Sequence, residues 1–153
     1  MNLFQTRGCC FCPIVSGSSG NATYLEADGD GILIDCACSG KKIERALSDL
    51  GTSIQNVRGI FLTHGHHDHY GSIGVLARRH KIPIFANAPT WKRIRDDNTS
   101  GRHVTGKIDP DLIRVTDTLF TGSTVTLGSL TIASFPVPHD CPGTVGYRIS
   151  LGG

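Results

Sequence analysis

The stretch LTHGHHDHYGS, residues 62–72, constrains this chain more than any other feature. It places four of the seven histidines within six positions, directly after the mostly apolar run 57–62 that is typical of a buried strand. A loop that leaves a strand end can turn residues i, i+2, i+4 and i+5 toward one centre. Imidazole nitrogens and a carboxylate oxygen are natural ligands of zinc, manganese or iron. The sequence therefore predicts a metal-binding loop built by His64, His66, Asp68 and His69.

Residue patterns on both sides of this loop predict a layered α/β protein. Before the loop we expect strands at 11–15, 22–27 and 32–35, a turn at the DGDG sequence 28–31, and a helix at 40–50 capped by Ser39. After the loop we expect helices at 71–79 and around 89–95, strands at 82–86 and 145–151, and a hairpin over 124–135 around Gly128 and Ser129. Residues 96–116 are polar and poorly patterned, so they are predicted to be loop.

Length and composition favour one domain. A chain of 153 residues with 39% hydrophobic residues can build one core but is too short for two ordinary ones. An apolar run near 18 residues is absent from the sequence, and residues 1–15 lack the apolar segment of a secretion signal. We therefore expect a cytoplasmic protein without a membrane partner.

Six cysteines raise the question of redox state. Without a secretion signal, free thiols are expected rather than a disulfide framework. The pairs Cys10-x-Cys12 and Cys36-x-Cys38 leave a four-sulfur zinc site as an alternative, although zinc ligand pairs are usually spaced by two to four residues.

Positive charge is concentrated in one segment. The formal net charge is only +2, yet residues 76–107 contain eight lysines and arginines against two aspartates. Such a segment favours an anionic substrate such as a phosphodiester. The alternative is a solvated helix face.

The histidine stretch resembles a known signature. THGHHDH, residues 63–69, is similar to the H-x-H-x-D-H motif of the metallo-β-lactamase fold. Residues 12–36, 59–86 and 135–149 look like the YycJ/WalJ branch, which is associated with nuclease-type phosphodiester hydrolysis, and the similarity runs from about Phe11 to the last residue. The resemblance implies an αβ/βα sandwich, of which residues 1–153 would form a single incomplete domain: the N-terminal half and the start of the second half.

The resemblance also implies a ligand set. His64, His66 and His139 would bind one divalent metal ion, and Asp68 with His69 a second; zinc is preferred, with manganese or iron as alternatives. Asp35 would brace the metal loop from behind. The loop 16–21, SGSSGN, would lie beside the cleft, where Ser18, Ser19 or Asn21 can meet a phosphate, or it is simply a tight turn between strands. His67 is expected on the substrate side of the loop or facing outward.

Two departures from the family pattern shape the functional hypotheses. The family has a metal-bridging aspartate and a last histidine ligand beyond the third histidine, whereas this sequence has no aspartate after Asp140 and no histidine after His139. Our first hypothesis is a metal-dependent nuclease that cleaves DNA through a dinuclear metal-activated water, with Asp68 orienting the attacking hydroxide. The alternatives are a thioester or other small-molecule hydrolase, and an inactive, truncated metal-binding half-domain. Exposed strand edges would lead such a half-fold to pair with a second copy or a complementing chain.

Overall fold

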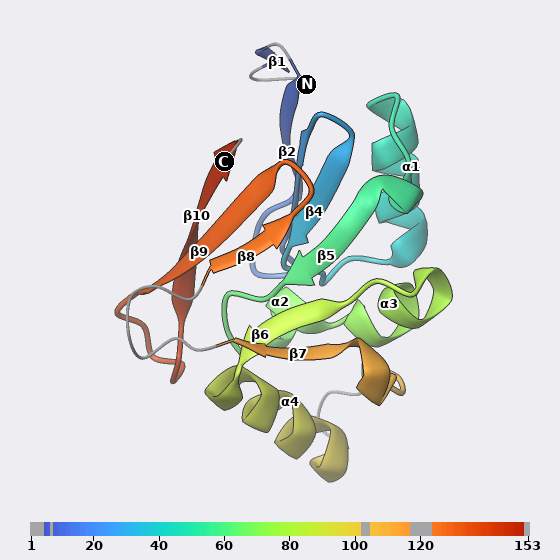
Figure 1. The fold of residues 1–153 in the computed structure, drawn as a ribbon. Helices are drawn as coiled ribbons and strands as arrows, with labels where there is room; N and C mark the ends of the chain where they lie inside the picture. Colours follow the sequence, from blue (N-terminus) through green and yellow to red (C-terminus); the bar gives the residue numbers. More distant parts are fainter. Residues whose placement is uncertain (1–4, 7, 102–104, 117–123, 152–153) are drawn as a thin grey trace.

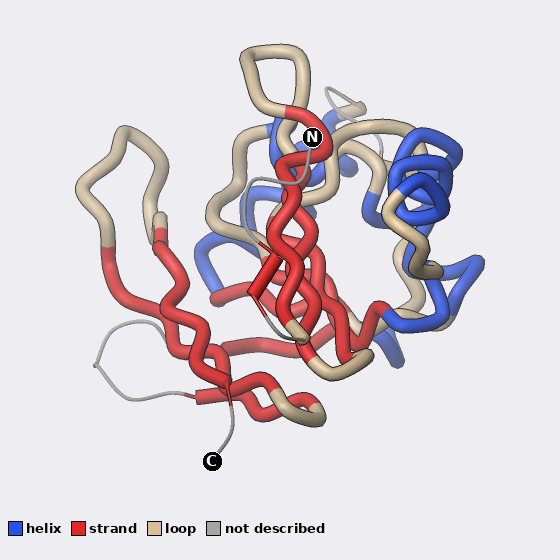
Figure 2. The backbone as a smooth tube through the Cα atoms, turned by 90° about the horizontal axis from the view of Figure 1, so that it is seen from above, coloured by secondary structure: helices blue, strands red, loops and turns tan. Residues whose placement is uncertain are grey.

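The computed structural model describes residues 5–6, 8–101, 105–116 and 124–151, which form three layers (Figure 1). A seven-stranded sheet contains, in spatial order, β1 (Gln5–Thr6), β2 (Cys9–Val15), β3 (Ala22–Ala27), β4 (Asp30–Ile34), β5 (Val57–Phe61), β6 (Ile84–Asn87) and β7 (Ile113–Thr116). A three-stranded sheet contains β10 (Val145–Leu151), β9 (Leu130–Pro136) and β8 (Thr124–Leu127). Seen from above, the small sheet lies on one side of the large sheet and the helices lie on the other (Figure 2).

The helices connect or follow the strands of the large sheet. They are α1 (Gly40–Asp49), α2 (His67–Tyr70), α3 (Ile73–His80) and α4 (Ala88–Ser100), with the short 3₁₀ helices η1 (Ile54–Asn56) and η2 (Pro110–Leu112). Strands β1 to β4 pair antiparallel, whereas β4 to β7 pair parallel. Parallel pairing places the carboxyl ends of β4, β5 and β6 at the same edge of the sheet. The predicted layered α/β architecture is confirmed.

Turn chemistry explains the first hairpin. β3 and β4 are joined at Asp28 and Gly29, which have φ angles of 50° and 83°. Two consecutive positive φ angles are typical of a tight two-residue hairpin turn, which aspartate and glycine tolerate well. The predicted turn is thus confirmed but is shorter than 28–31, because β4 begins at Asp30. The β8–β9 hairpin around Gly128 and Ser129 is confirmed as well.

Two apolar cores hold the layers together. Between the large sheet and the helices, Ile43 and Leu47 of α1 are fully buried, and the Ser39 side chain caps this helix by accepting from the amide of Lys42. Between the two sheets, the rings of Phe61 and Phe85 stack at 4.5 Å. The apolar faces of the two sheets therefore pack directly against each other.

A polar clamp fixes the small sheet to the large one. Asp30 at the start of β4 pairs with Arg58 at 2.9 Å, and its other oxygen accepts from the backbone amide of Ser129 at 3.0 Å. The Ser129 hydroxyl donates to the carbonyl of Ala27 at 2.8 Å. The clamp joins the hairpin turn of β8–β9 to the edge of the β3–β4 hairpin.

One sequence prediction was wrong and others were shifted. Residues 96–116 are not all loop, because α4 continues to Ser100 and β7 pairs with β6. Asp97 occupies a buried position of α4, so a polar residue interrupts the apolar period that would have revealed the helix. The predicted helix at 71–79 corresponds to α3, and it is preceded by α2, a short helix inside the histidine loop that was not predicted. β6 begins at Ile84 rather than Ile82.

The cysteines and helices answer two further expectations. All six cysteines are free thiols, as predicted. Among the described residues, the group suited to hold a metal consists of histidines, so the four-sulfur alternative is not supported. None of the helices that the structure describes is long and apolar enough to span a membrane.

Candidate metal centre

The segments that follow β4, β5 and β6 leave the large sheet at the carboxyl ends of its parallel strands (Figure 1). Asp35 directly follows β4, His64 lies three residues after β5, and Asn87 ends β6. In sheets of this kind ligands bind in the crevice outside the carboxyl ends of the strands. The parallel register of the sheet is therefore what brings these distant parts of the sequence together.

Three histidines form the centre of the site. One nitrogen from each of His64, His66 and His139 lies within 4.8 Å of the other two, and His64 Nε2 is 3.1 Å from His66 Nδ1. His64 is buried, and this burial together with the charges of His69, His66 and His139 lowers its pKa to about 4. A neutral ring keeps a free nitrogen lone pair at pH 7. Three converging imidazoles fit a divalent transition metal, whose preferred donors they are.

The loop between β9 and β10 delivers His139 to this group. Its Gly143 carbonyl accepts from Asn87 Nδ2 at 2.5 Å, and Val145 N donates to Thr63 O at 2.9 Å. His139 Nδ1 lies 2.7 Å from Asp140 Oδ1 and accepts a hydrogen bond from the backbone amide of Cys141 at 3.2 Å.

Asp35 connects two parts of the histidine loop. Its φ angle of 60° is unusual for a residue with a side chain and turns the carboxylate back toward the loop. One oxygen accepts from the amide of Thr63 at 2.8 Å, and the other lies 2.7 Å from His69 Nδ1. The Thr63 hydroxyl lies 2.9 Å from that second oxygen and 2.9 Å from His64 Nδ1. Asp35 and Thr63 together therefore orient two histidine rings.

Asp68 and His69 form a second pair beside the three histidines. His69 Nε2 lies 3.6 Å from Asp68 Oδ2, and the rings of His69 and His64 are 4.1 Å apart. Burial acts to lower the pKa of His69, but the hydrogen bond and charge of Asp35 and the charge of Asp68 outweigh it and raise the pKa. The pair lies next to the three-histidine group without belonging to it.

The SGSSGN loop reaches this second pair through one residue. The side-chain Nδ2 of Asn21 is 3.2 Å from His69 Nε2 and 3.4 Å from Asp68 Oδ2. The backbone amide of Asn21 donates to the backbone carbonyl of Asp68 at 2.8 Å. Ser18 and Ser19 are exposed at the tip of the same loop. His67 lies outside the three-histidine group, with its ring edge-on to Tyr70 at 5.5 Å.

Several residues of the site were missed by sequence reasoning. Thr63 stands directly before the first histidine, and Asn87 ends the neighbouring strand. Their positions at or near strand ends were the only features of the sequence that could have marked them as site residues. The contacts of Tyr70, Arg93 and Asp97 beneath the loop involve α4, and no local pattern connects α4 to the histidines.

Half of the eight basic residues in the segment 76–107 form ion pairs with described residues. Seven of its eight basic residues lie among the described residues, and Arg102 lies outside them. Four of the seven form ion pairs: Arg79 with Glu44, Lys81 with Asp109, Lys92 with Asp96, and Arg93 with Asp97. The four pairs are typical of a solvated helix face, whereas Arg78, Arg95 and Lys107 form no ion pair among the described residues, so both interpretations of the segment remain predictions.

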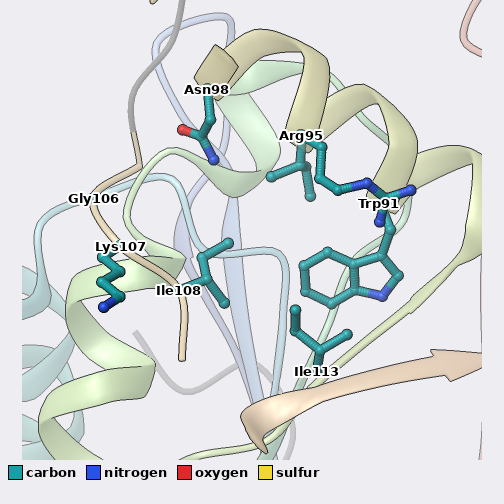
Figure 3. A pocket seen from close by; sticks show the side chains of 8 residues that line it. Trp91, Arg95, Asn98, Gly106, Lys107, Ile108 and Ile113 are labelled. Carbon is teal, nitrogen blue, oxygen red and sulfur yellow. The ribbon is translucent and has the colours of Figure 1, made fainter. Parts of the chain in front are cut away.

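Two cavities differ in their relation to the histidines. Figure 3 shows Trp91, Ile108 and Ile113 around a mainly apolar cavity of about 350 Å³ beside α4, with Arg95 and Lys107 also lining it. This cavity has no lining residue in common with the histidine group. A second cavity, of about 340 Å³, is lined by His139 itself and by prolines of β9, the β9–β10 loop and α4: Pro89, Pro136, Pro138 and Pro142.

Comparison with known sequences gives a consistent assignment. Residues 15–149 match the family model of the metallo-beta-lactamase superfamily. The chain is 35% identical over 135 residues to Exodeoxyribonuclease WalJ of Streptococcus pneumoniae and 34% identical over 140 residues to Exodeoxyribonuclease YycJ of Bacillus anthracis. These alignments cover 88% and 92% of this chain but 47% and 49% of the relatives. The chain thus spans about half the length of the curated relatives it matches.

Solved structures agree in fold. A B3 metallo-beta-lactamase with an active site glutamic acid superimposes with a TM-score of 0.72 at 19% identity, covering 93% of this chain and 54% of that one. The chemotaxis sensor ODP, in a peroxy diiron species, gives a TM-score of 0.72 at 17% identity, with 96% and 57% covered. At these identities the likeness concerns the fold alone. Since the family model matches most of the sequence and the fold agrees, this chain belongs to the metallo-β-lactamase superfamily.

Proposed function

We propose that this chain carries the metal-binding core of a hydrolase that cleaves phosphodiester bonds in DNA with metal-activated water. One observation supports this above all: three imidazole nitrogens converge at the carboxyl edge of the parallel strands, in a chain whose relatives are named exodeoxyribonucleases. Because the chain spans about half the length of those relatives, the activity, the substrate and the partners are all parts of the proposal.

We assign two cation sites to the centre. His64, His66 and His139 hold the first cation through nitrogen, and Asp68 with His69 contributes to the second. Zinc is the first choice because imidazole-rich sets suit it, and the same donors accept manganese or iron. Asp35 and Thr63 keep the rings of His64 and His69 in the orientation that binding needs.

The residues of the chain divide the chemical work. Divalent cations at such a centre act as Lewis acids and make hydroxide available near neutral pH. Asp68, whose side chain is 35% exposed, accepts a hydrogen bond from the attacking water and orients it. Asn21 fixes the position of the Asp68 carboxylate from behind. Burial of His64 keeps water away from one side of the centre.

Substrate reaches the centre from the exposed side of the loops. Ser18, Ser19 and their backbone amides at the tip of the SGSSGN loop, with His67, are the groups that we assign to a phosphate of the substrate. The proline-lined cavity beside His139 offers an apolar, uncharged wall for the part of the substrate next to the scissile bond.

The proposal is tested by offering two substrate classes in parallel. The purified chain, loaded with zinc or manganese, is incubated with end-labelled single- and double-stranded DNA and, separately, with a chromogenic thioester. We expect DNA cleavage that is lost in His64→Ala and Asp68→Asn. It should be retained in His80→Gln, a control whose histidine pairs with Glu44 away from the centre.

Each other outcome has a defined meaning. If the thioester is hydrolysed and DNA is not cleaved, the chain is a small-molecule hydrolase of the same fold and not a nuclease. If the chain binds metal tightly but turns over neither substrate, it is a metal-binding module that has no activity by itself. DNA cleavage that persists in His64→Ala contradicts the assignment of the centre.

A further inference from the structure

Beneath the histidine loop, α4 carries a carboxylate at a buried position. Asp97 is only 4% exposed. Its Oδ2 accepts a 2.6 Å hydrogen bond from the hydroxyl of Tyr70 and a 3.0 Å hydrogen bond from Arg93 Nε. Burying a carboxylate destabilises a fold unless the group is paired and hydrogen-bonded. An apolar residue at this position would fill the same space with less loss of stability.

Both partners of Asp97 contact the metal loop. Tyr70 is fully buried and belongs to α2, the short helix that also contains Asp68 and His69. The aliphatic part of Arg93 lies against Gly65: a Cβ at this glycine would lie 2.7 Å from both Cβ and Cγ of Arg93.

These contacts fall at different parts of the loop. Gly65 separates His64 from His66, and Tyr70 directly follows His69. The ring of Tyr70 also packs edge-on against His67 at 5.5 Å. The Asp97 carboxylate thus joins, through two side chains, the beginning and the end of the segment that supplies four of the five ligands assigned above.

We propose that Asp97 is a positioning residue of the metal centre. It acts through Tyr70 and Arg93, which hold the histidine loop in its metal-binding conformation before the metal arrives. The proposal rests on the metal centre proposed above, since the ligands of that centre are what Asp97 positions. A glycine-containing loop that is already ordered loses less conformational entropy on binding a metal.

The matched pair Asp97→Asn and Asp96→Asn tests the proposal in the full chain. Asn preserves the size of Asp97 but removes the charge that Arg93 and Tyr70 recognise. Asp96, its neighbour on α4, has a side chain that is 57% exposed and pairs with Lys92. Affinity for Co²⁺ and the ligand-field absorption of the bound ion are measured for both. Changes to groups that support metal ligands lower affinity about 10- to 100-fold, so we expect about tenfold weaker binding and a shifted absorption band for Asp97→Asn alone.

A second variant keeps the test decisive if Asp97→Asn does not fold. Tyr70→Phe removes only the hydroxyl, and circular dichroism with thermal unfolding of the metal-free chain checks its fold. We expect the same direction of change in Co²⁺ affinity and absorption. The double variant should lose little more than Asp97→Asn alone, because the two groups act through one hydrogen bond.

A metal-free measurement separates this inference from the proposed function. Nitrogen-15 spectra of the histidine rings should shift for His64, His66 and His69 in Asp97→Asn and Tyr70→Phe, with His80 as the unshifted internal reference. If the wild-type chain takes up no cobalt, the metal centre fails and these spectra alone decide whether Asp97 orders the loop. Folded variants with lower thermal stability but unchanged cobalt absorption, affinity and ring spectra would overturn the proposal.

Discussion

Removing the carboxylate of Asp35 should destabilise the chain even without metal. Asp35 is 5% exposed and accepts from the Thr63 amide, the Thr63 hydroxyl and His69 Nδ1 at 2.7 to 2.9 Å. In Asp35→Ala these buried donors lose their acceptor. Breaking a buried, hydrogen-bonded charge pair by removing one partner costs about 3–5 kcal/mol, so we expect a loss of that size in the free energy of unfolding at pH 6.

The loss should depend on pH with a defined sign. His69 has a raised pKa in the folded chain, so its protonated form contributes stability that is fully present below the unfolded pKa of about 6.5. That contribution disappears as the pH rises through the folded pKa. In Asp35→Ala burial of His69 remains while its acidic partner is gone, so the pKa of His69 should fall. The free energy of unfolding of the variant should therefore fall further below that of the wild type at pH 6 than at pH 9.

Urea unfolding of the metal-free wild type and variant at these two pH values measures both effects. Asp35→Asn, which preserves the shape of the side chain, serves as the second variant if the alanine variant is unfolded. A loss below about 1 kcal/mol at pH 6, or an equal loss at both pH values, would refute the role assigned to this carboxylate.

Three further predictions follow from other parts of the structure. Because the pKa of His64 is lowered to about 4, the metal-free chain should lose stability as the pH falls from about 6.5 to 4; a ring titration midpoint above 6 by NMR contradicts this. Phe61→Ala should cost about 3–5 kcal/mol in urea unfolding because it opens the core between the sheets, whereas Phe11→Ala, at a side chain 44% exposed, should cost about 0.5 kcal/mol or less; equal losses contradict the packing. Gly143→Ala places a Cβ 2.8 Å from Pro89 and should weaken zinc binding by displacing the His139 loop. Gly51 has the same φ of 76°, but a Cβ added there meets open space, so Gly51→Ala should leave zinc binding unchanged.

The parts of the fold that sequence predicted well are those set by local chemistry. Strand β3 alternates apolar and polar residues, and Asp28–Gly29 supplies a turn signal, so the hairpin could be located without tertiary knowledge. The histidine spacing likewise predicted a metal-binding loop, and the histidines directly follow β5. Both features depend on neighbouring residues alone.

The parts that escaped prediction depend on contacts between distant segments. The end of α4 was missed because Asp97 takes a buried position that an apolar residue usually occupies, and its partner Tyr70 lies 27 residues earlier. Strand β7 has a polar, half-exposed sequence, and it forms because its backbone pairs with the edge of β6. Asn87 joins the His139 loop over 56 residues, a contact that no sequence pattern specifies.

The central claim is that His64, His66 and His139 create one metal centre from two distant segments of the chain. It is tested most directly by measuring zinc content, by mass spectrometry after dialysis, in the wild type, His64→Ala, His139→Ala and His80→Gln. The account predicts tightly held zinc in the wild type and in His80→Gln, and its loss in the other two variants. Negligible zinc in all four proteins, or equal zinc in all four, would contradict it.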